Sequence, residues 1–227
     1  MENIKAILFD WDGTLVDTCQ LVLDAHNHVR QKMGLIPWSM NDFLSGGSKS
    51  TREYYPEIYG ERAEQAEEIL YTYVEANHLD YLKEMPEAQA LLKSIAVPMG
   101  VVSNKRHHTL VKEVKALGWE SFFETIVGAG RAEQDKPSPK PIEMAREELS
   151  IRVSNHEILY VGDTETDLKC SDNAGCQSCL IQNGKRAEDL KQQYTPELSF
   201  MSIRAFKNHL WNCTNTNIIR MAEKKAC

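Results

Sequence analysis

An apolar segment near the start of the chain ends abruptly in two aspartates, and this feature most constrains how the chain folds. Residues 4–9 are mostly aliphatic or aromatic, and Asp10, Asp12 and Gly13 follow them. A run of this length is typical of a buried strand, which the glycine can break. Ligands of a parallel α/β sheet bind outside the carboxyl ends of its strands, so we expect both carboxylates at the edge of such a crevice.

The carboxylates of Asp10 and Asp12 would repel each other there unless a positive charge lies between them or one of them is protonated. A Mg²⁺ ion takes oxygen ligands and keeps several waters, so it would neutralise one carboxylate and leave the other to exchange protons. The alternative is an acidic turn without a ligand, in which Gly13 only supplies the bend. Motifs elsewhere in the chain are needed to distinguish a metal-binding pair of carboxylates from an acidic turn.

The composition is that of an ordinary globular protein and excludes some functions. A chain of 227 residues can bury a sizeable core, with or without a smaller insertion. A formal net charge of -7 and a pI near 5.6 give no basic field for nucleic acid. No segment resembles a signal peptide or reaches the length of a membrane span. We therefore expect a cytoplasmic protein with no nucleic-acid or membrane partner.

The six cysteines are predicted to be free thiols, because they form no small-domain disulfide framework. Cys176 and Cys179 form a C-x-x-C pattern, which also occurs in metal and redox sites. They fall in a predicted strand, where a separation of three residues places their side chains on opposite faces. We therefore expect neither kind of site there.

The predicted elements divide into an alternating α/β core and an inserted helical segment. Four further short apolar runs are predicted strands with helices between them: residues 99–104, 125–129, 157–163 and 175–181. Residues 18–83 show helical spacing and interrupt this alternation. We predict a core with a Rossmann-like parallel sheet from residues 1–17 and 84–212, a helical insertion at 18–83 and a C-terminal tail at 213–227.

Within the insertion, one loop is a candidate for contacting an anion. It has the sequence Ser-Gly-Gly-Ser-Lys-Ser at residues 45–50, and Lys49 and Arg52 add positive charge. The alternative is a solvated connection between two helices. After this loop, residues 54–60 are aromatic and contain Pro56, which predicts a turn, and residues 61–78 read as one long helix.

Small polar side chains end the predicted strand at residues 99–104. Ser103, Asn104 and the free N–H groups of the next helix can bind a phosphate oxygen. Lys105 and Arg106 come next, followed by two histidines. These basic residues could steer an anion, but a solvated first helical turn is the simpler interpretation.

Two later segments bring charged groups to the same edge. Lys136 lies in a proline-stiffened loop, Lys-Pro-Ser-Pro-Lys-Pro, where it is either a fixed charge or an exposed loop lysine. Asp163 ends the predicted strand at 157–163, and Asp167 follows it in the opening of a helix. Parallel strands end at one edge, so these carboxylates are expected near Asp10.

These motifs, in this order, resemble those of the haloacid dehalogenase superfamily of phosphatases. The matching residues are Asp10-Trp11-Asp12-Gly13-Thr14, Ser103, Lys136 in Lys-Pro-Ser-Pro, and Gly162-Asp163-Thr164-Glu165-Thr166-Asp167. The resemblance spans residues 4 to about 210, and the insertion is similar to the C1 cap domain of that superfamily. The cap position and the context of the loop lysine are similar to those of phosphoglycolate phosphatases.

The resemblance implies a Mg²⁺-dependent phosphatase that forms an aspartyl phosphate from a small phosphorylated metabolite. Asp10 would be the nucleophile, and Asp12 would act first as general acid and then as general base. Ser103 and Lys136 would hold the phosphoryl oxygens, with Asn104 beside Ser103.

The resemblance also implies a metal site and a substrate-binding cap. Mg²⁺ would be bound by Asp10, the backbone carbonyl of Asp12 and Asp163, and Asp167 would orient this set from behind. The cap would close over the substrate and bring its loop onto the leaving group. The candidate loop residues are Ser48, Lys49 and Arg52.

Several alternatives stay open at this point. Phosphonoacetaldehyde hydrolases and dehalogenases lack the second acid, so Asp12 disfavours both. A sugar phosphomutase of the β-phosphoglucomutase type keeps both aspartates, and a non-catalytic binding protein could keep the fold without turnover. The sequence does not choose between phosphoglycolate, a sugar phosphate and a nucleotide as substrate, and it does not indicate an oligomeric state.

Overall fold

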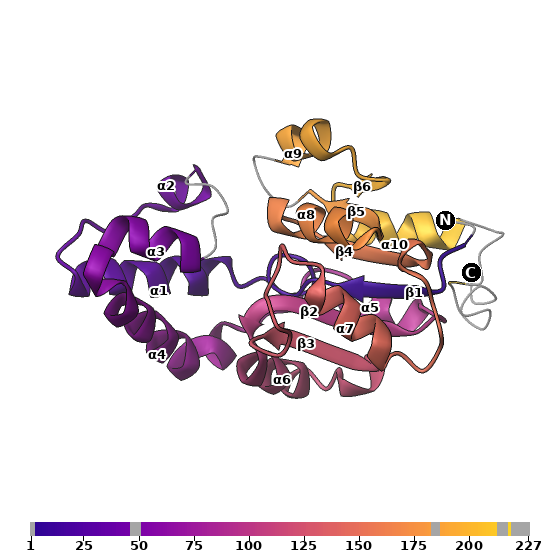
Figure 1. Cartoon of the computed structure of the whole chain (residues 1–227), viewed down its shortest axis with the longest axis horizontal. Helices are drawn as coiled ribbons and strands as arrows, with labels where there is room; N and C mark the ends of the chain where they lie inside the picture. The colour runs from indigo at the N-terminus through magenta and orange to yellow at the C-terminus, as the bar shows by residue number, and fades with distance from the viewer. Residues whose placement is uncertain (1–2, 46–50, 183–186, 213–217, 219–227) are drawn as a thin grey trace. The chain divides into compact units, whose positions relative to one another are not determined.

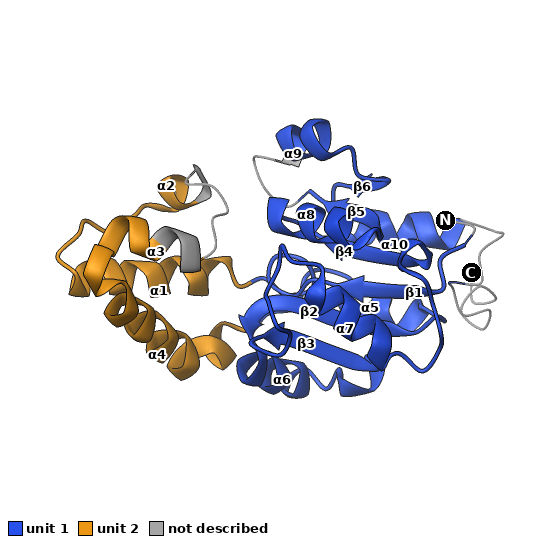
Figure 2. Cartoon of the chain, in the orientation of Figure 1, with its two compact units in different colours: residues 1–17, 83–227 blue, residues 18–82 orange. Residues whose placement is uncertain are grey.

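The chain forms two compact units, Met1–Asp17 with Lys83–Cys227, and Thr18–Leu82 (Figures 1 and 2). The computed structural model describes residues 3–45, 51–182, 187–212 and 218. The first unit contains all six strands of the sheet, β1 Ala6–Phe9, β2 Met99–Arg106, β3 Thr125–Ala129, β4 Ile158–Gly162, β5 Gln177–Ile181 and β6 Leu198–Phe200. Its α-helices are α5 Ala88–Ser94, α6 His107–Ala116, α7 Lys140–Glu148, α8 Glu165–Ala174, α9 Ala187–Tyr194 and α10 Ile203–Asn212.

The sheet of the first unit is parallel throughout, with the strand order β3-β2-β1-β4-β5-β6. Helices flank it, as Figure 1 shows. This arrangement confirms the predicted α/β class with a Rossmann-like parallel core. Short 3₁₀ turns at Glu120–Phe122 and Asn155–Glu157 precede β3 and β4.

β1 lies in the middle of the sheet, and its four residues are completely buried. Strands covered on both faces need apolar side chains on both, which explains the continuous run rather than an alternating one. On one face Leu8 belongs to a cluster with Val102, Val127, Ile142 and Tyr160. Because β1 lies between β2 and β4, the residues that follow it lie between the carboxyl ends of these two strands.

The second unit is helical, with α1 Cys19–Lys32, α2 Met40–Ser45, α3 Thr51–Tyr59, a 3₁₀ turn at Gly60–Arg62 and α4 Ala63–Tyr81. The turn predicted at residues 54–60 is wrong, because α3 runs through Pro56. Tyr55 is buried in the core of this unit and contacts the ring of Tyr59, so packing outweighs the proline's low helix propensity. Ser48, Lys49 and the side chain of Arg52 lie outside the described residues.

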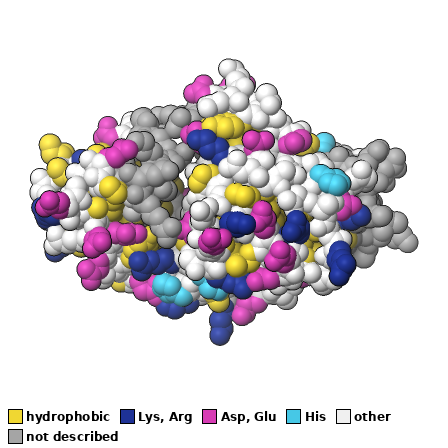
Figure 3. Space-filling model, viewed as in Figure 1, with side chains coloured by type: hydrophobic (Ala, Val, Ile, Leu, Met, Phe, Trp, Pro, Cys, Tyr) yellow, Lys and Arg dark blue, Asp and Glu magenta, His cyan; other side chains and the backbone are white. Residues whose placement is uncertain are grey.

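Acidic and basic side chains are interspersed on the face shown in Figure 3. Within the described ranges, no helix combines the length and the apolar character that crossing a membrane requires.

Candidate active site

The carboxyl ends of β1 and β4 lie side by side, at the point where the strand order reverses. β1 pairs with β2 on one side and with β4 on the other, which makes the β1–β4 junction the topological switch point of the sheet. Asp10 directly follows β1 and donates its backbone N–H to the carbonyl oxygen of Val161 at 2.8 Å. Asp163 directly follows β4. Both aspartates therefore reach the position where open α/β sheets bind their ligands.

Lys136 is buried at this junction and contacts three polar groups. Its Nζ donates to Oδ1 of Asp10 at 2.6 Å and to Oδ1 of Asp167 at 2.6 Å. The hydroxyl of Tyr160 accepts a third hydrogen bond at 3.0 Å. The lysine side chain is only 4% exposed, so the alternative interpretation as an exposed loop lysine is wrong.

The loop that carries Lys136 is held by Asn104. The Nδ2 group of Asn104 donates to the Lys136 carbonyl at 2.9 Å, and its Oδ1 accepts from the Lys136 N–H at 2.9 Å. This double contact ties the loop to β2, so that the lysine is positioned by backbone contacts as well as by its charge. The predicted contact of Asn104 with phosphate stays a prediction, because the described contacts of its amide are to Lys136.

Asp167 is fixed by the start of α8. Thr164 is the N-cap residue, and Oδ2 of Asp167 accepts from its N–H at 3.0 Å and from its hydroxyl at 2.6 Å. The Thr164 side chain in turn accepts from the Asp167 N–H, which completes a capping box. A Cβ at Gly162 would lie 2.4 Å from the Cβ of Asp167, so glycine allows this close packing. The box leaves the other carboxylate oxygen facing Lys136.

The positive charge of Lys136 acts to lower the pKa values of three carboxyl groups, those of Asp10, Asp163 and Asp167. Burial alone would raise the pKa of Asp167, but the charge and hydrogen bond of Lys136, together with the hydrogen bonds from Thr164, outweigh burial and lower it. Burial, together with the charge of Asp167, raises the pKa of Asp10 to about 7 despite Lys136. Burial and the neighbouring carboxylates also raise the pKa of Asp163 well above its usual range. A divalent cation would relieve this excess of negative charge.

The residues at this junction fit such a cation. Asp10, Asp163 and Asp167 each offer a carboxylate oxygen, and these atoms lie within 4.8 Å of one another. Both oxygens of Asp167 already accept hydrogen bonds from side chains, which leaves Asp10 and Asp163 as the better ligands. A donor set made of oxygen atoms suits a hard ion such as Mg²⁺.

Gly13 and Thr14, in the turn that follows β1, both lie close to the carboxylate of Asp163. The hydroxyl of Thr14 donates to its Oδ1 at 3.0 Å. Gly13 has φ near +83°, and a Cβ at this residue would lie 2.4 Å from Oδ2 of Asp163. Glycine therefore permits both the turn after β1 and the close approach of the carboxylate.

Asp12 contacts a different partner. Its Oδ1 lies 2.7 Å from Nζ of Lys105, which also contacts Glu113. The Lys105 side chain is only 8% exposed, so the interpretation of this residue as part of a solvated helical turn is wrong. Burial alone would lower the pKa of Lys105, but the charges of Asp12 and Glu113 outweigh burial and raise it. Lys105 therefore keeps its positive charge.

Ser103 is buried within β2, the strand next to β1 in the sheet. Its Oγ accepts the N–H of Lys105 at 3.1 Å, so the hydroxyl hydrogen can be donated to another acceptor. β1 ends at Phe9, which pairs with Val101, so Ser103 lies two residues further along β2 and next to the residues that follow β1. The predicted strand end at residues 103–104 is wrong, because β2 continues to Arg106.

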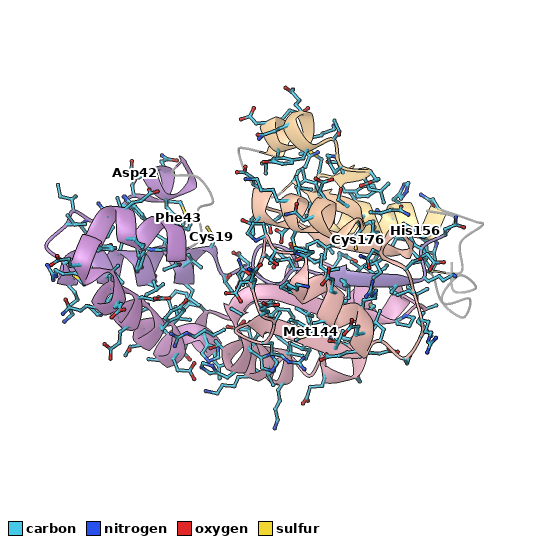
Figure 4. The ribbon with its side chains drawn as sticks, viewed as in Figure 1. Cys19, Asp42, Phe43, Met144, His156 and Cys176 are labelled. Atoms are coloured by element: carbon cyan, nitrogen blue, oxygen red, sulfur yellow. The ribbon has the colours of Figure 1, made fainter. Side chains whose placement is uncertain are left out.

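The described cysteines show no sign of a reactive or metal-binding thiol, although the Sγ of Cys170 donates to the carbonyl of Ser138 in the loop that carries Lys136. Cys170, Cys176 and Cys179 are buried thiols outside any disulfide, and Cys176 lies just before β5 (Figure 4). Burial raises the pKa of Cys170 and of Cys176 to about 12, so both thiols stay protonated. Buried protonated thiols are poor nucleophiles and poor metal ligands.

Three residues of this region were not predicted as site residues: Tyr160, Lys105 and Glu113. Tyr160 lies in a buried strand, where an aromatic residue reads as part of the core. Glu113 is a completely buried acid between Leu110 and Val114 on α6. Glu113 occupies a position of α6 where the helical pattern predicts an apolar residue. This was the signal in the sequence that a cation, here Lys105, would be buried beside it.

The fold and these contacts define an α/β protein whose switch point is suited to a metal ion and an anionic ligand. A sequence model of the family described as Haloacid dehalogenase-like hydrolase matches residues 7–181. The chain belongs to this family. A solved structure of a haloacid dehalogenase-like hydrolase from Streptococcus pneumoniae has a TM-score of 0.82 at 21% identity, covering 92% of this chain and 100% of that one.

Curated relatives are named as phosphatases. Pyrophosphatase PpaX of Halalkalibacterium halodurans is 26% identical, covering 88% of this chain and 94% of that protein. Phosphoglycolate phosphatase of Neisseria meningitidis is 28% identical, covering 81% of this chain and 83% of that protein. The predicted resemblance to the haloacid dehalogenase superfamily, and with it the prediction of an enzyme of the phosphatase class, is confirmed.

Proposed function

We propose that this protein is a Mg²⁺-dependent phosphatase that hydrolyses a small phosphate monoester through an aspartyl phosphate on Asp10. The observation that carries the proposal is the contact of Lys136 with Asp10 beside Asp163 at the switch point. A buried lysine held against a carboxylate can meet the charge of a transferring phosphoryl group. The names of the relatives support phosphoglycolate as one substrate to test and pyrophosphate as another.

In this mechanism a carboxylate oxygen of Asp10 attacks phosphorus while the bond to the leaving oxygen breaks. Asp12 donates its proton to that oxygen, and its carboxylate then takes a proton from the water that hydrolyses the aspartyl phosphate. The Ser103 hydroxyl donates a hydrogen bond to a phosphoryl oxygen, and Lys136, whose donors contact Asp10, Asp167 and Tyr160, places its positive charge beside the phosphoryl group. Asp10, the Asp12 carbonyl and Asp163 would hold Mg²⁺, which when bound supplies positive charge for the phosphoryl oxygens.

We also propose that the second unit acts as the cap that selects the substrate. It is inserted directly after the segment that contains Asp10 and Asp12. The roles of Ser48, Lys49 and Arg52 at the leaving group stay predictions. The cytoplasmic location also stays a prediction.

The test is phosphate release from phosphoglycolate, sugar phosphates, nucleotides and pyrophosphate, with Mg²⁺ or with EDTA. Asp10→Asn removes the nucleophile and should abolish release. Asp172→Asn makes the same change at an exposed position of α8 and should leave release unchanged. Absence of release from every substrate would contradict the proposal, and isomerisation of a sugar phosphate instead would favour the phosphomutase alternative.

A further inference from the structure

The side chain of Asp12 is connected to a completely buried acid through Lys105. The Lys105 Nζ lies 2.7 Å from Oδ1 of Asp12, 2.8 Å from Oε1 of Glu113 and 2.7 Å from Oε2 of Glu113. An ammonium group has three donors. The contacts match these donors in number, so the position of the Lys105 head group is set by Glu113 on one side and by Asp12 on the other.

Glu113 is itself fixed by the residue that precedes Asp12. Its Oε2 accepts the Nε1–H of Trp11 at 2.6 Å, and both side chains are completely buried. The indole of Trp11 packs edge-on against Trp119, with ring centroids 5.8 Å apart. Helix α6 therefore holds two consecutive residues after β1, Trp11 directly through Glu113 and Asp12 through Lys105.

The side chain of Asp12 is less enclosed than that of Asp10. Its side chain is 28% exposed, whereas that of Asp10 is 7% exposed and is held by Lys136. A partly exposed carboxylate keeps one rotamer only where its contacts offset the conformational entropy that it loses. Proton transfer requires the donor within hydrogen-bond reach of the leaving oxygen, so the orientation of this carboxylate affects the rate.

We propose that Lys105, held by Glu113, is a positioning residue that orients the Asp12 carboxyl group for proton transfer. This inference rests on the proposed phosphatase function. As the bond between Asp10 and phosphorus forms, the ester bond breaks and the proton of Asp12 passes to the leaving alkoxide. Water then attacks phosphorus, its proton returns to Asp12, and the bond to Asp10 breaks. The sum is ester and water converted to alcohol and phosphate.

A purely structural role, in which Lys105 only neutralises Glu113, makes a different prediction. Loss of such a role would lower kcat/KM equally for all substrates, because the variant would act only through the fold. Loss of proton donation matters for an alkyl ester, whose alkoxide is a poor leaving group. It matters little for 2,4-dinitrophenyl phosphate, whose phenolate leaves without a proton. The value of kcat/KM reports the steps up to departure of the leaving group, so it isolates this effect from the later hydrolysis.

The test compares kcat/KM for the best alkyl phosphate and for 2,4-dinitrophenyl phosphate. Lys105→Met combined with Glu113→Gln removes both buried charges together and keeps an acceptor for Trp11. Glu113→Gln alone, which is nearly isosteric, is the second variant if the double variant does not fold. Lys207→Met is the matched control, because this lysine pairs with Glu87 and has no place in the proposed site. Circular dichroism and thermal unfolding establish that each variant is folded.

For the double variant we expect kcat/KM to fall about 100-fold with the alkyl ester and less than about 3-fold with the dinitrophenyl ester, within the range of general acid catalysis. Glu113→Gln should show a smaller loss with the same selectivity, and Lys207→Met should show none. Equal losses on both esters in a folded variant, or no loss, would overturn the inference and leave the proposed function intact. A wild-type protein inactive on every ester would overturn both.

Discussion

Lys136 and Asp10 meet through a 2.6 Å contact between Nζ and Oδ1, although 126 positions separate them in the sequence. The same ammonium group lies 2.6 Å from Asp167, and all three side chains are buried. The contact therefore joins the end of β1 to the loop before α7 and to the start of α8. A buried ion pair that loses one partner leaves an uncompensated charge, which makes Lys136 important for stability as well as for chemistry.

Lys136→Met is expected to lower the free energy of unfolding by about 3–5 kcal/mol, because two buried carboxylates lose their counter-charge. It should also reduce phosphatase turnover below detection. Lys140→Met is the matched control, since this lysine is exposed and pairs with Glu143 on the surface. The control should change neither quantity measurably in urea unfolding or phosphate release. A Lys136→Met protein as stable as wild type would contradict the ion-pair assignment.

Gly13→Ala tests the close approach of the first motif to Asp163. Gly13 and Gly118 both have positive φ, so alanine at either should cost about 1–2 kcal/mol of backbone strain. Only at Gly13 would the new Cβ lie 2.4 Å from Oδ2 of Asp163, whereas no atom lies within 4 Å of a Cβ at Gly118. Gly13→Ala should therefore weaken Mg²⁺ binding about 10-fold or more in calorimetric titration. Gly118→Ala should leave it unchanged, and equal affinities would exclude this role.

Asp163→Asn should have opposite effects on stability with and without metal. In EDTA the variant should melt at a higher temperature than wild type, because it removes one of the mutually repelling carboxylates. Mg²⁺ at about 100 times its Kd should stabilise wild type by about 2.7 kcal/mol, or a rise in Tm of roughly 5–10 °C. The variant should lose most of this rise. Identical Mg²⁺ shifts in thermal unfolding would remove Asp163 from the ligand set.

The strands and the site residues at their carboxyl ends could be predicted, because both depend on the local pattern of apolar and polar residues. The strand before Asp10 has a continuous apolar run that ends at a polar pair, and parallel topology brings such ends to one edge. The same reasoning identified Ser103 and Asp163. β6 was not predicted, because a three-residue edge strand carries almost no pattern.

The contacts between distant residues could not be predicted in this way. Whether Lys136 was buried or exposed depended on Asp167 and Asn104, and nothing in its own segment specifies them as partners. Lys105 was misread because basic residues at the start of a helix are usually solvated. Its burial follows from Glu113, which lies two turns further along the chain and becomes a partner only when α6 packs.

The second unit provides a pH-dependent prediction, because His26 is enclosed by aromatic rings. Its ring centroid lies 5.7 Å from that of Trp38 and 6.2 Å from that of Phe43, which Figure 4 labels near α2. The hydroxyl of Tyr55 lies 3.1 Å from its Nδ1. Burial, followed by the charge of Arg30, lowers the pKa of His26 to about 4. The folded protein therefore favours the neutral imidazole.

A histidine whose folded pKa lies below its unfolded value of 6.5 stabilises the protein fully above pH 6.5, and this stabilisation is lost as the pH falls towards about 4. One pKa unit corresponds to about 1.4 kcal/mol, so the loss should reach at most about 3.5 kcal/mol. His26→Gln keeps a polar partner for Tyr55 but does not titrate. Urea unfolding at about pH 7.5 and about pH 4.5 should show a smaller acid-induced loss for the variant than for wild type. Carboxylates elsewhere lose stability equally in both proteins, so equal losses would mean that His26 titrates normally in the folded state.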